Sequence, residues 1–236
     1  VGVLAVDLLC ALASIVIFSI NIAKGVTPLW SVIFAACTVV AYIGLFFVCN
    51  FKVLSPGAND NLTGVFVAVS ALKCLKESGI RYENTEVCAL LTGSEEAGLR
   101  GATAFTKRHK GENKDVETYI IAFDTMRDYD YMTIYHRDMT GMVKNSPEVV
   151  ALLDEACNDP DVNHPLPHGV VPFGASDAAA FSRGGFKAAA VAGQNPKYAP
   201  YYHNRRDTPD QMIPETFALG LDIALAAIEA FDRDQK

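Results

Sequence analysis

The sequence predicts a three-layer α/β/α domain with a mostly parallel mixed sheet, preceded by a helical hydrophobic hairpin. Two observations predict this organisation. Charged residues are nearly absent before Lys52 and common after it, and beyond that point short apolar runs alternate with segments of helical spacing. Strands that alternate with helices form a largely parallel sheet that is covered on both faces. The formal net charge of −7 disfavours nucleic acid as a partner.

The N-terminal region, residues 1–52, is predicted to be a pair of membrane-spanning helices. Residues 29–51 contain no charged side chain over 23 positions, which is long enough to cross a bilayer as a helix. An earlier uncharged run, residues 8–23, is separated from it by a short polar turn with helix breakers. We therefore expect a hairpin that has the lipid bilayer as its partner. A signal peptide and a buried helical hairpin are the alternatives.

The second region, residues 53–236, is predicted to be the α/β domain. Apolar residues at helical spacing predict helices at residues 62–78, 97–109, 147–157, 176–183 and 214–231. Short β-rich runs predict strands at residues 86–92, 119–123, 132–135 and 187–192. Gly79 is expected to end the first helix, and Ser146 is expected to cap the third. In such sheets, binding sites form at the carboxyl ends of the strands.

Four polar features stand where such a site is expected. They are Asp60 in a glycine-bounded turn, the adjacent pair Glu95 and Glu96, Asp124 at the end of a strand, and His203 in a polar loop. Each has an ordinary structural interpretation, namely a helix cap, a solvated first turn, a turn former and an exposed loop histidine. Together, however, three oxygen ligands and an imidazole suit Zn²⁺. A neighbouring carboxylate can then transfer protons to and from water.

The motifs around these residues resemble the zinc aminopeptidase family of co-catalytic metallopeptidases, which includes bacterial leucine aminopeptidases. The resembling segments are PGANDNLTG, LLTGSEEAGLRGATAF, AFD, FGASDAAAFSRGGFKAAAV and YYHNRRDTPD. They lie within residues 55–231. The resemblance implies the zinc exopeptidase (phosphorylase/hydrolase-like) fold and a zinc-dependent aminopeptidase that hydrolyses the N-terminal peptide bond of peptides. It also implies a bacterial protein, and with the hairpin we expect a membrane location.

The resemblance assigns roles to individual residues. Four positions match zinc ligands of the family, which holds two ions: Asp60 as the bridging aspartate, Glu96, Asp124 and His203. Glu95 matches the general base, and Tyr202 matches a residue that helps to polarise the substrate carbonyl. Ser176 and Asp177 match a Ser-Asp-His segment near the substrate pocket, in which Ala178 stands in place of the histidine.

One departure from the family concerns its first zinc ligand, a histidine in a His-x-Asp strand end upstream of the bridging aspartate. No histidine precedes Asp60. Either the hairpin is an insertion and the upstream portion lies outside this chain, which the start at Val1 favours, or one zinc site has been lost. Asp60, Glu96 and His203 would still suffice to hold one zinc ion.

Two other functions are compatible with the sequence. Glutaminyl cyclases share this fold and use a single zinc ion held by Asp, Glu and His, and they transfer an acyl group within the substrate. A non-catalytic, membrane-anchored domain on a peptidase scaffold is the second alternative. The segments GANDN and EEAGLRGA resemble the hydrolases more closely than the cyclases.

Overall fold

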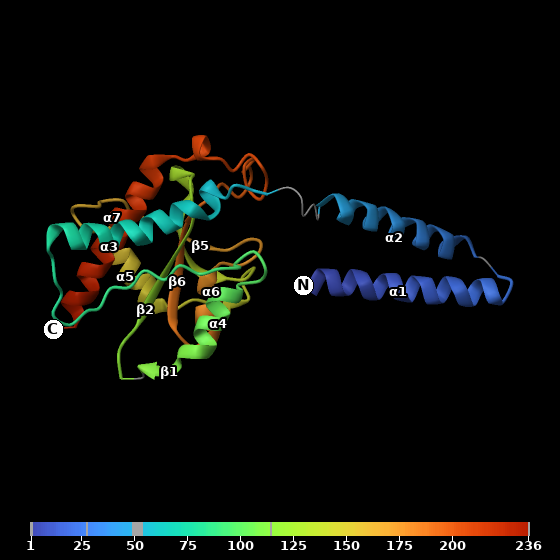
Figure 1. Ribbon diagram of the computed structural model, residues 1–236, viewed down its shortest axis with the longest axis horizontal. Helices are drawn as coiled ribbons and strands as arrows, with labels where there is room; N and C mark the ends of the chain where they lie inside the picture. The colour runs from blue at the N-terminus through green and yellow to red at the C-terminus, as the bar shows by residue number, and fades with distance from the viewer. Residues whose placement is uncertain (1, 27, 49–53, 114, 236) are drawn as a thin grey trace. The chain divides into compact units, whose positions relative to one another are not determined.

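The computed structural model describes residues 2–26, 28–48, 54–113 and 115–235. The chain divides into two compact units, Val1–Leu54 and Ser55–Lys236. The helices (Figure 1) are α1 Gly2–Ala23, α2 Leu29–Val48, α3 Thr63–Ser78, α4 Arg100–His109, α5 Pro147–Cys157, α6 Asp177–Gly184 and α7 Pro214–Asp234. The strands are β1 Lys110–Asn113, β2 Tyr119–Met126, β3 Met132–Asp138, β4 Val143–Lys144, β5 His168–Val170 and β6 Lys187–Gly193.

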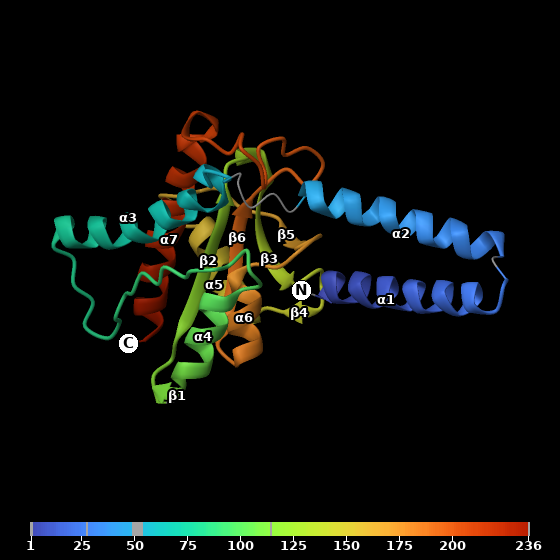
Figure 2. The ribbon, with the colours of Figure 1, turned by 45° about the vertical axis from the view of Figure 1, so that its right-hand side comes forward.

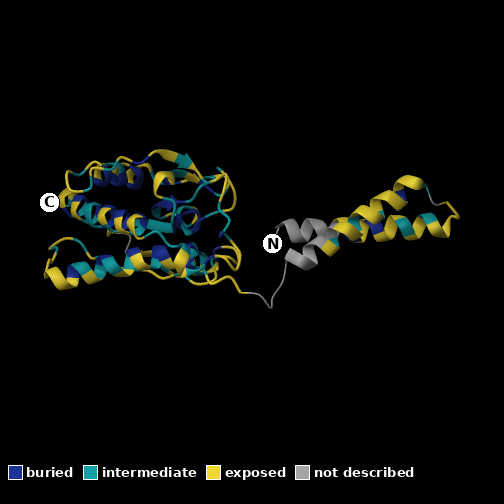
Figure 3. Cartoon of the chain, turned by 90° about the horizontal axis from the view of Figure 1, so that it is seen from above, coloured by how far each residue is buried: buried dark blue, intermediate teal, exposed yellow. Residues whose placement is uncertain are grey.

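The first unit consists of α1 and α2, which pack against each other as an antiparallel pair. Ala11, Ser14 and Ser31 are buried, while most of the other described side chains are exposed (Figure 3). Across the described residues, no helix combines the length and the apolar character needed to cross a membrane. The prediction of two membrane spans in residues 1–52 is therefore not supported, and the lipid bilayer as a partner stays a prediction.

The second unit is built on a mixed sheet with the strand order β2-β6-β3-β4, in which β5 also pairs with β3. β2 runs parallel to β6, and β5 runs parallel to β3. β3 is antiparallel to both β6 and β4. A mixed sheet was predicted and is observed. It was also predicted to be mostly parallel, but among the described strands two pairings are parallel and two are antiparallel. The centre of the sheet is β6, whose small side chains from Ala188 to Val191 are fully buried.

Helices cover both faces of the sheet (Figure 2). α3, α5 and α7 pack on one face, where Ile134, Leu153 and Ile223 belong to the larger core cluster. α4 and α6 pack on the other face, where Phe181 belongs to a second, alanine-rich cluster. Two separate cores on opposite faces of one sheet confirm the predicted three-layer α/β/α arrangement.

The predicted elements of this unit are observed with two informative differences. Residues 86–92 were predicted to form a strand, but the structure assigns none there, because β2 and this segment do not pair. The helix predicted from residue 97 begins only at Arg100, because Gly98 and Leu99 adopt positive φ angles of 96° and 56° that no α-helix accepts. The short strands β1, β4 and β5 were not predicted, since runs of two to four residues carry too little alternation to be recognised.

Candidate metal centre

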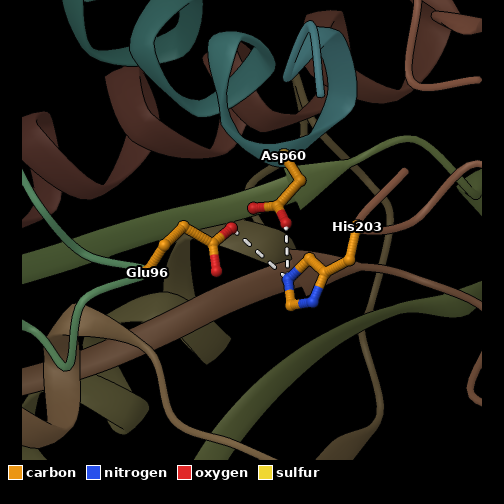
Figure 4. Close-up of side chains that lie close together, drawn as sticks. All are labelled: Asp60, Glu96 and His203. Carbon is orange, nitrogen blue, oxygen red and sulfur yellow. Dashed lines mark ion pairs between the residues drawn. The ribbon is translucent and has the colours of Figure 1, made fainter. Parts of the chain in front are cut away.

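Three side chains from distant parts of the chain converge in the second unit (Figure 4). The Nε2 atom of His203 lies 3.1 Å from Oδ2 of Asp60 and 3.4 Å from Oε1 of Glu96. One ligand atom from each of the three residues lies within 4.8 Å of the other two. The Asp60 carboxylate is only 10% exposed, whereas the side chains of Glu96 and His203 are at least half exposed. The cluster is therefore anchored in the protein at Asp60 and open to solvent at Glu96.

The buried carboxylate of Asp207 brings the Asp60 loop to the His203 loop. Its Oδ1 accepts hydrogen bonds from the backbone N–H and the side-chain amide of Asn59, at 2.8 and 2.7 Å. Its Oδ2 accepts the backbone N–H of Asp60 at 3.0 Å. The backbone N–H of Ala58 donates to the Asp207 carbonyl at 3.2 Å. Asp207 was not among the predicted site residues, although it lies in the same polar loop as His203. Its burial, which the sequence does not reveal, identifies its positioning role.

Asn61 fastens the same loop to the end of β2. Its side-chain amide donates to the carbonyl of Phe123 at 2.8 Å. Its Oδ1 accepts the backbone N–H groups of Gly64 and Thr125, at 3.0 and 3.2 Å. The Asn61 side chain therefore joins the first turn of α3 to the end of β2 and holds the Asp60 loop there. Asp124 itself is outside the three-residue ligand cluster but close enough to Asp60 for the two carboxylates to repel each other.

The adjacent acids Glu95 and Glu96 lie on a tight turn before α4. The carbonyl of Glu95 accepts the backbone N–H groups of Gly98 and Leu99, at 2.8 and 2.7 Å. The turn is closed by the N–H of Gly101, which donates to the carbonyl of Gly93 at 2.9 Å. These local bonds hold the turn from which Glu96 reaches His203 and from which Glu95 comes close to Asp124 and Asp60.

Two carboxyl groups of the site hold their protons unusually tightly. Burial raises the pKa of Glu95 to about 8, and repulsion from Asp124 and Glu96 adds to the shift. Burial also raises the pKa of Asp124 to about 7, with repulsion from Asp60 as the next cause. Such shifts indicate more negative charge than the site can neutralise by itself. A divalent cation would supply the missing positive charge.

The negative charge of the site favours the protonated, charged form of the His203 imidazole. Its hydrogen bonds to Asp60 and Glu96 raise the pKa of His203 to about 10. The same contact lowers the pKa of Glu96, while burial raises the pKa of Asp60. A protonated His203 thus stands where a cation is needed. Two carboxylates and one imidazole, all able to reach one point, are a donor set that fits zinc with an open position.

Two of the other predicted site residues also lie at the cluster. The ring of Tyr202 stacks on that of His203, with centroids 3.8 Å apart, and burial with four nearby carboxylates raises the pKa of its hydroxyl. Asp177 accepts a hydrogen bond from Thr92 and contributes to the raised pKa of Glu95. Ser176 caps α6 instead, and its hydroxyl donates to the buried Asp138 at 2.6 Å. A substrate-binding role for Ser176 stays a prediction.

The chain matches a known family over most of its length. The model of peptidase family M28 matches residues 43–228. The chain belongs to peptidase family M28. No curated protein matches it significantly. The family assignment accounts for the motifs around Asp60, Glu95, Glu96, Asp124 and His203, because all of them lie inside the matched region.

Solved structures show the same fold as this M28 chain. The LapA aminopeptidase of Legionella pneumophila is 18% identical with a TM-score of 0.63, over 75% of this chain and 47% of LapA. An aminopeptidase from Aneurinibacillus sp. strain AM-1 is 25% identical with a TM-score of 0.61, over 74% and 39%. The zinc aminopeptidase BSAP of Bacillus subtilis is 22% identical with a TM-score of 0.61, over 74% and 42%. The chain thus spans less than half the length of each of these proteins.

Proposed function

We propose that this chain carries the catalytic machinery of a zinc-dependent aminopeptidase that acts on peptides. The observation that supports this is the convergence of Asp60, Glu96 and His203 on one point, with the Glu95 carboxyl beside them. Membership of the M28 family supports peptide substrates. One zinc ion would be held by these three ligands, and Asp124 would join Asp60 in holding a second.

In the proposed reaction, each side chain of the site has a separate role. Zinc held by Asp60, Glu96 and His203 would supply Lewis acidity and would make water easier to deprotonate. Glu95 accepts a proton from the attacking water and returns it to the departing amine. Without metal the pKa of Glu95 is raised to about 8, and a cation bound beside it would lower this pKa, so that the carboxylate is ionised and can act as a base. Tyr202 donates its phenolic proton in a hydrogen bond to the substrate carbonyl oxygen, where negative charge develops in the transition state.

The charge of the site also favours an amino terminus as the group that is recognised. Asp124 and Asp177 lie close enough to raise the pKa of Glu95, and Asp177 also raises the pKa of Asp124. A free α-ammonium group relieves this repulsion, whereas a free carboxylate would increase it. We therefore infer an aminopeptidase and not a carboxypeptidase.

Two substitutions separate the proposed roles. Glu95→Gln keeps the size of the side chain but removes the base, so hydrolysis of an aminoacyl-nitroanilide should fall by about 10²–10⁴-fold while zinc content stays unchanged. His203→Ala should lower the zinc content measured by atomic absorption. His168→Ala is the matched control, because this exposed histidine pairs with Asp154 away from the cluster. Full activity in Glu95→Gln would refute the base, and normal zinc content in His203→Ala would refute the ligand.

A glutaminyl cyclase is the second candidate, and one observation favours it. The described residues that reach one point are three, Asp60, Glu96 and His203, which is the set needed for a single zinc ion. The fold of a glutaminyl cyclase from an Acidobacteriales bacterium matches at 16% identity with a TM-score of 0.55. Release of ammonia from a peptide with N-terminal glutamine, without hydrolysis of the nitroanilide, would support the cyclase. Absence of zinc binding would instead support a non-catalytic domain.

A further inference from the structure

The loop that carries Tyr202 and His203 depends on side chains for its position. Residues 194–208, all of which the structure describes, belong to no helix or strand. In Figure 1 they form part of the orange-red segment between β6 and α7. Asn204 shapes the turn locally, because its side-chain amide donates to the carbonyls of Pro200 and Tyr202, at 3.0 and 2.9 Å. These local bonds do not tie the loop to the sheet, so its position needs other contacts.

Asp128, two residues beyond the end of β2, binds this loop at two places. Its Oδ2 accepts the backbone N–H of Asn195 at 2.8 Å and the hydroxyl of Tyr201 at 3.1 Å. The side chain of Asp128 is only 12% exposed, and Tyr201 is fully buried. Asp128 is itself fixed to β6, because its backbone N–H donates to the carbonyl of Gly193 at 2.5 Å. Hydrogen bonds to a carboxylate are stronger than those between neutral groups, so Asp128 joins the loop firmly to the sheet.

Arg127 secures Asp128 and the far end of the same loop. Its guanidinium pairs with Oδ1 of Asp128 at 2.5 Å and lies over the ring of Tyr201, 4.5 Å from the centroid. Its Nε donates to the carbonyl of Gln211 at 2.9 Å, where the loop approaches α7. A planar guanidinium can make the ion pair, the ring contact and this hydrogen bond together. The adjacent residues Arg127 and Asp128 therefore hold the loop at its start, its middle and its end.

Tyr201 connects these two residues to the candidate metal centre. Its ring is buried beside Arg127, whereas the next ring along the chain, that of Tyr202, stacks on His203. One tyrosine of this adjacent pair thus contacts the protein interior, and the other contacts the metal centre. Because the peptide bond between them is planar, fixing Tyr201 limits the orientations that are open to Tyr202.

We propose that Asp128 and Arg127 are positioning residues of the metal centre and that they act through Tyr201. We call these three residues the loop clamp. The loop clamp holds Tyr202 and His203 in the orientation in which the phenol reaches a substrate and the imidazole reaches a metal ion. Its effect on hydrolysis rests on the proposed function, whereas its effect on the loop does not.

Amide hydrogen exchange in the full, metal-free chain tests the loop clamp without any activity. Tyr201→Phe keeps the buried ring and removes only the hydroxyl that donates to Asp128. Exchange at the N–H groups of Asn195 and Tyr202 should become about 10-fold faster, because one bonds to Asp128 and the other bonds within the loop. Tyr119→Phe, at the opposite end of β2, is the matched control and should leave both rates unchanged. Unchanged rates in Tyr201→Phe would overturn the proposal.

Asp128→Asn tests the anchor itself. The two carboxylate oxygens of Asp128 accept from three donors, so an amide nitrogen in place of one oxygen faces at least one donor and cannot accept from it. Zinc affinity, measured by competition with a chelator, should fall about 10-fold in Tyr201→Phe and up to about 100-fold in Asp128→Asn. Unchanged affinity in both variants, or a larger loss in Tyr201→Phe than in Asp128→Asn, would overturn the proposal.

A double-mutant cycle with Tyr202 separates positioning from a general loss of stability. At saturating zinc, Tyr201→Phe should lower kcat for an aminoacyl-nitroanilide about 10-fold and change KM by less than about 2-fold, because the phenol acts in the transition state. In a Tyr202→Phe background, Tyr201→Phe should have little further effect, since the group that it positions is already absent. Equal losses of kcat in the two backgrounds would overturn the proposal. Full activity of Tyr202→Phe alone would refute the role of the phenol in the proposed function, while the exchange and zinc measurements would still decide the loop clamp.

Discussion

The two halves of the candidate metal centre are held in different ways. The Asp60 half is fixed by long-range hydrogen bonds, in which Asp207 and Asn61 tie the loop to the His203 loop and to the end of β2. The Glu95–Glu96 half rests on local bonds within its own turn, and the segment before it makes no backbone hydrogen bond to other described residues. The first half is therefore preorganised by the described chain, while the second half has freedom to move.

This difference shows which parts of the chain hold the metal ligands in place. The groups that hydrogen-bond to a metal ligand fix its orientation. Loss of these groups lowers the affinity for the metal. Around Asp60 they are buried side chains of the same unit. Around Glu96 they are few among the described residues, because residues 84–92 make no described backbone hydrogen bond.

The largest effect is expected from a pair of glycine substitutions, one in each half. A Cβ at Gly64 would lie 2.2 Å from the carbonyl oxygen of Phe123, and one at Gly101 would lie 2.4 Å from the carbonyl oxygen of Gly93. Both are clashes with backbone, but only the Glu95–Glu96 turn can shift to relieve its clash. Gly64→Ala should lower the free energy of unfolding by about 3 kcal/mol, and Gly101→Ala by about 1 kcal/mol. Urea denaturation measures both, and equal losses would contradict the difference between the halves.

The next effect concerns Asp207. Asp207→Ala removes the acceptor of three hydrogen bonds and frees the Asp60 loop, so zinc affinity should fall by about 10–100-fold. Competition with a chromophoric chelator measures this change. Asp210→Ala, an exposed carboxylate in the same segment, is the control and should bind zinc normally. Unchanged affinity in Asp207→Ala would show that the Asp60 loop holds its place without this anchor.

A smaller effect is expected in the pH dependence of the metal-free protein. The pKa values of Asp124 and Glu95 are raised in the folded state, from 3.8 to about 7 and from 4.5 to about 8. Their protonated forms therefore favour folding at low pH, and this contribution is lost as the pH rises through about 7 and 8. With EDTA present, the urea midpoint should fall between pH 5 and pH 8, and zinc should reverse the fall because its ligands bind deprotonated.

The two carboxyl groups should not contribute equally to this pH effect. Asp124 sits on a paired strand and cannot withdraw, whereas Glu95 lies on the less constrained turn. Asp124→Asn should therefore flatten the pH dependence more than Glu95→Gln does. A larger flattening by Glu95→Gln would mean that the turn is as rigid as the sheet.

Much of this protein could be predicted from its sequence, because the relevant signals are local. Helical spacing placed α5 from Pro147 to Cys157, and an apolar run placed the start of β2 at Tyr119. The motifs identified the three residues that converge, Asp60, Glu96 and His203, since the residue types and their order are themselves the signal. The strand predicted at residues 86–92 was wrong, since a strand exists only when a neighbouring strand pairs with it.

The sequence by itself determined the chemical groups of the site and the elements that carry them, since spacing and residue type act over a few positions. Only the tertiary structure decided which groups meet. It buried Asp207 as the anchor of the Asp60 loop, engaged the Ser176 hydroxyl with Asp138, and left residues 84–92 without a strand partner among the described residues. These outcomes depend on hydrogen bonds and packing between segments far apart in the chain, and a local pattern contains no information about them.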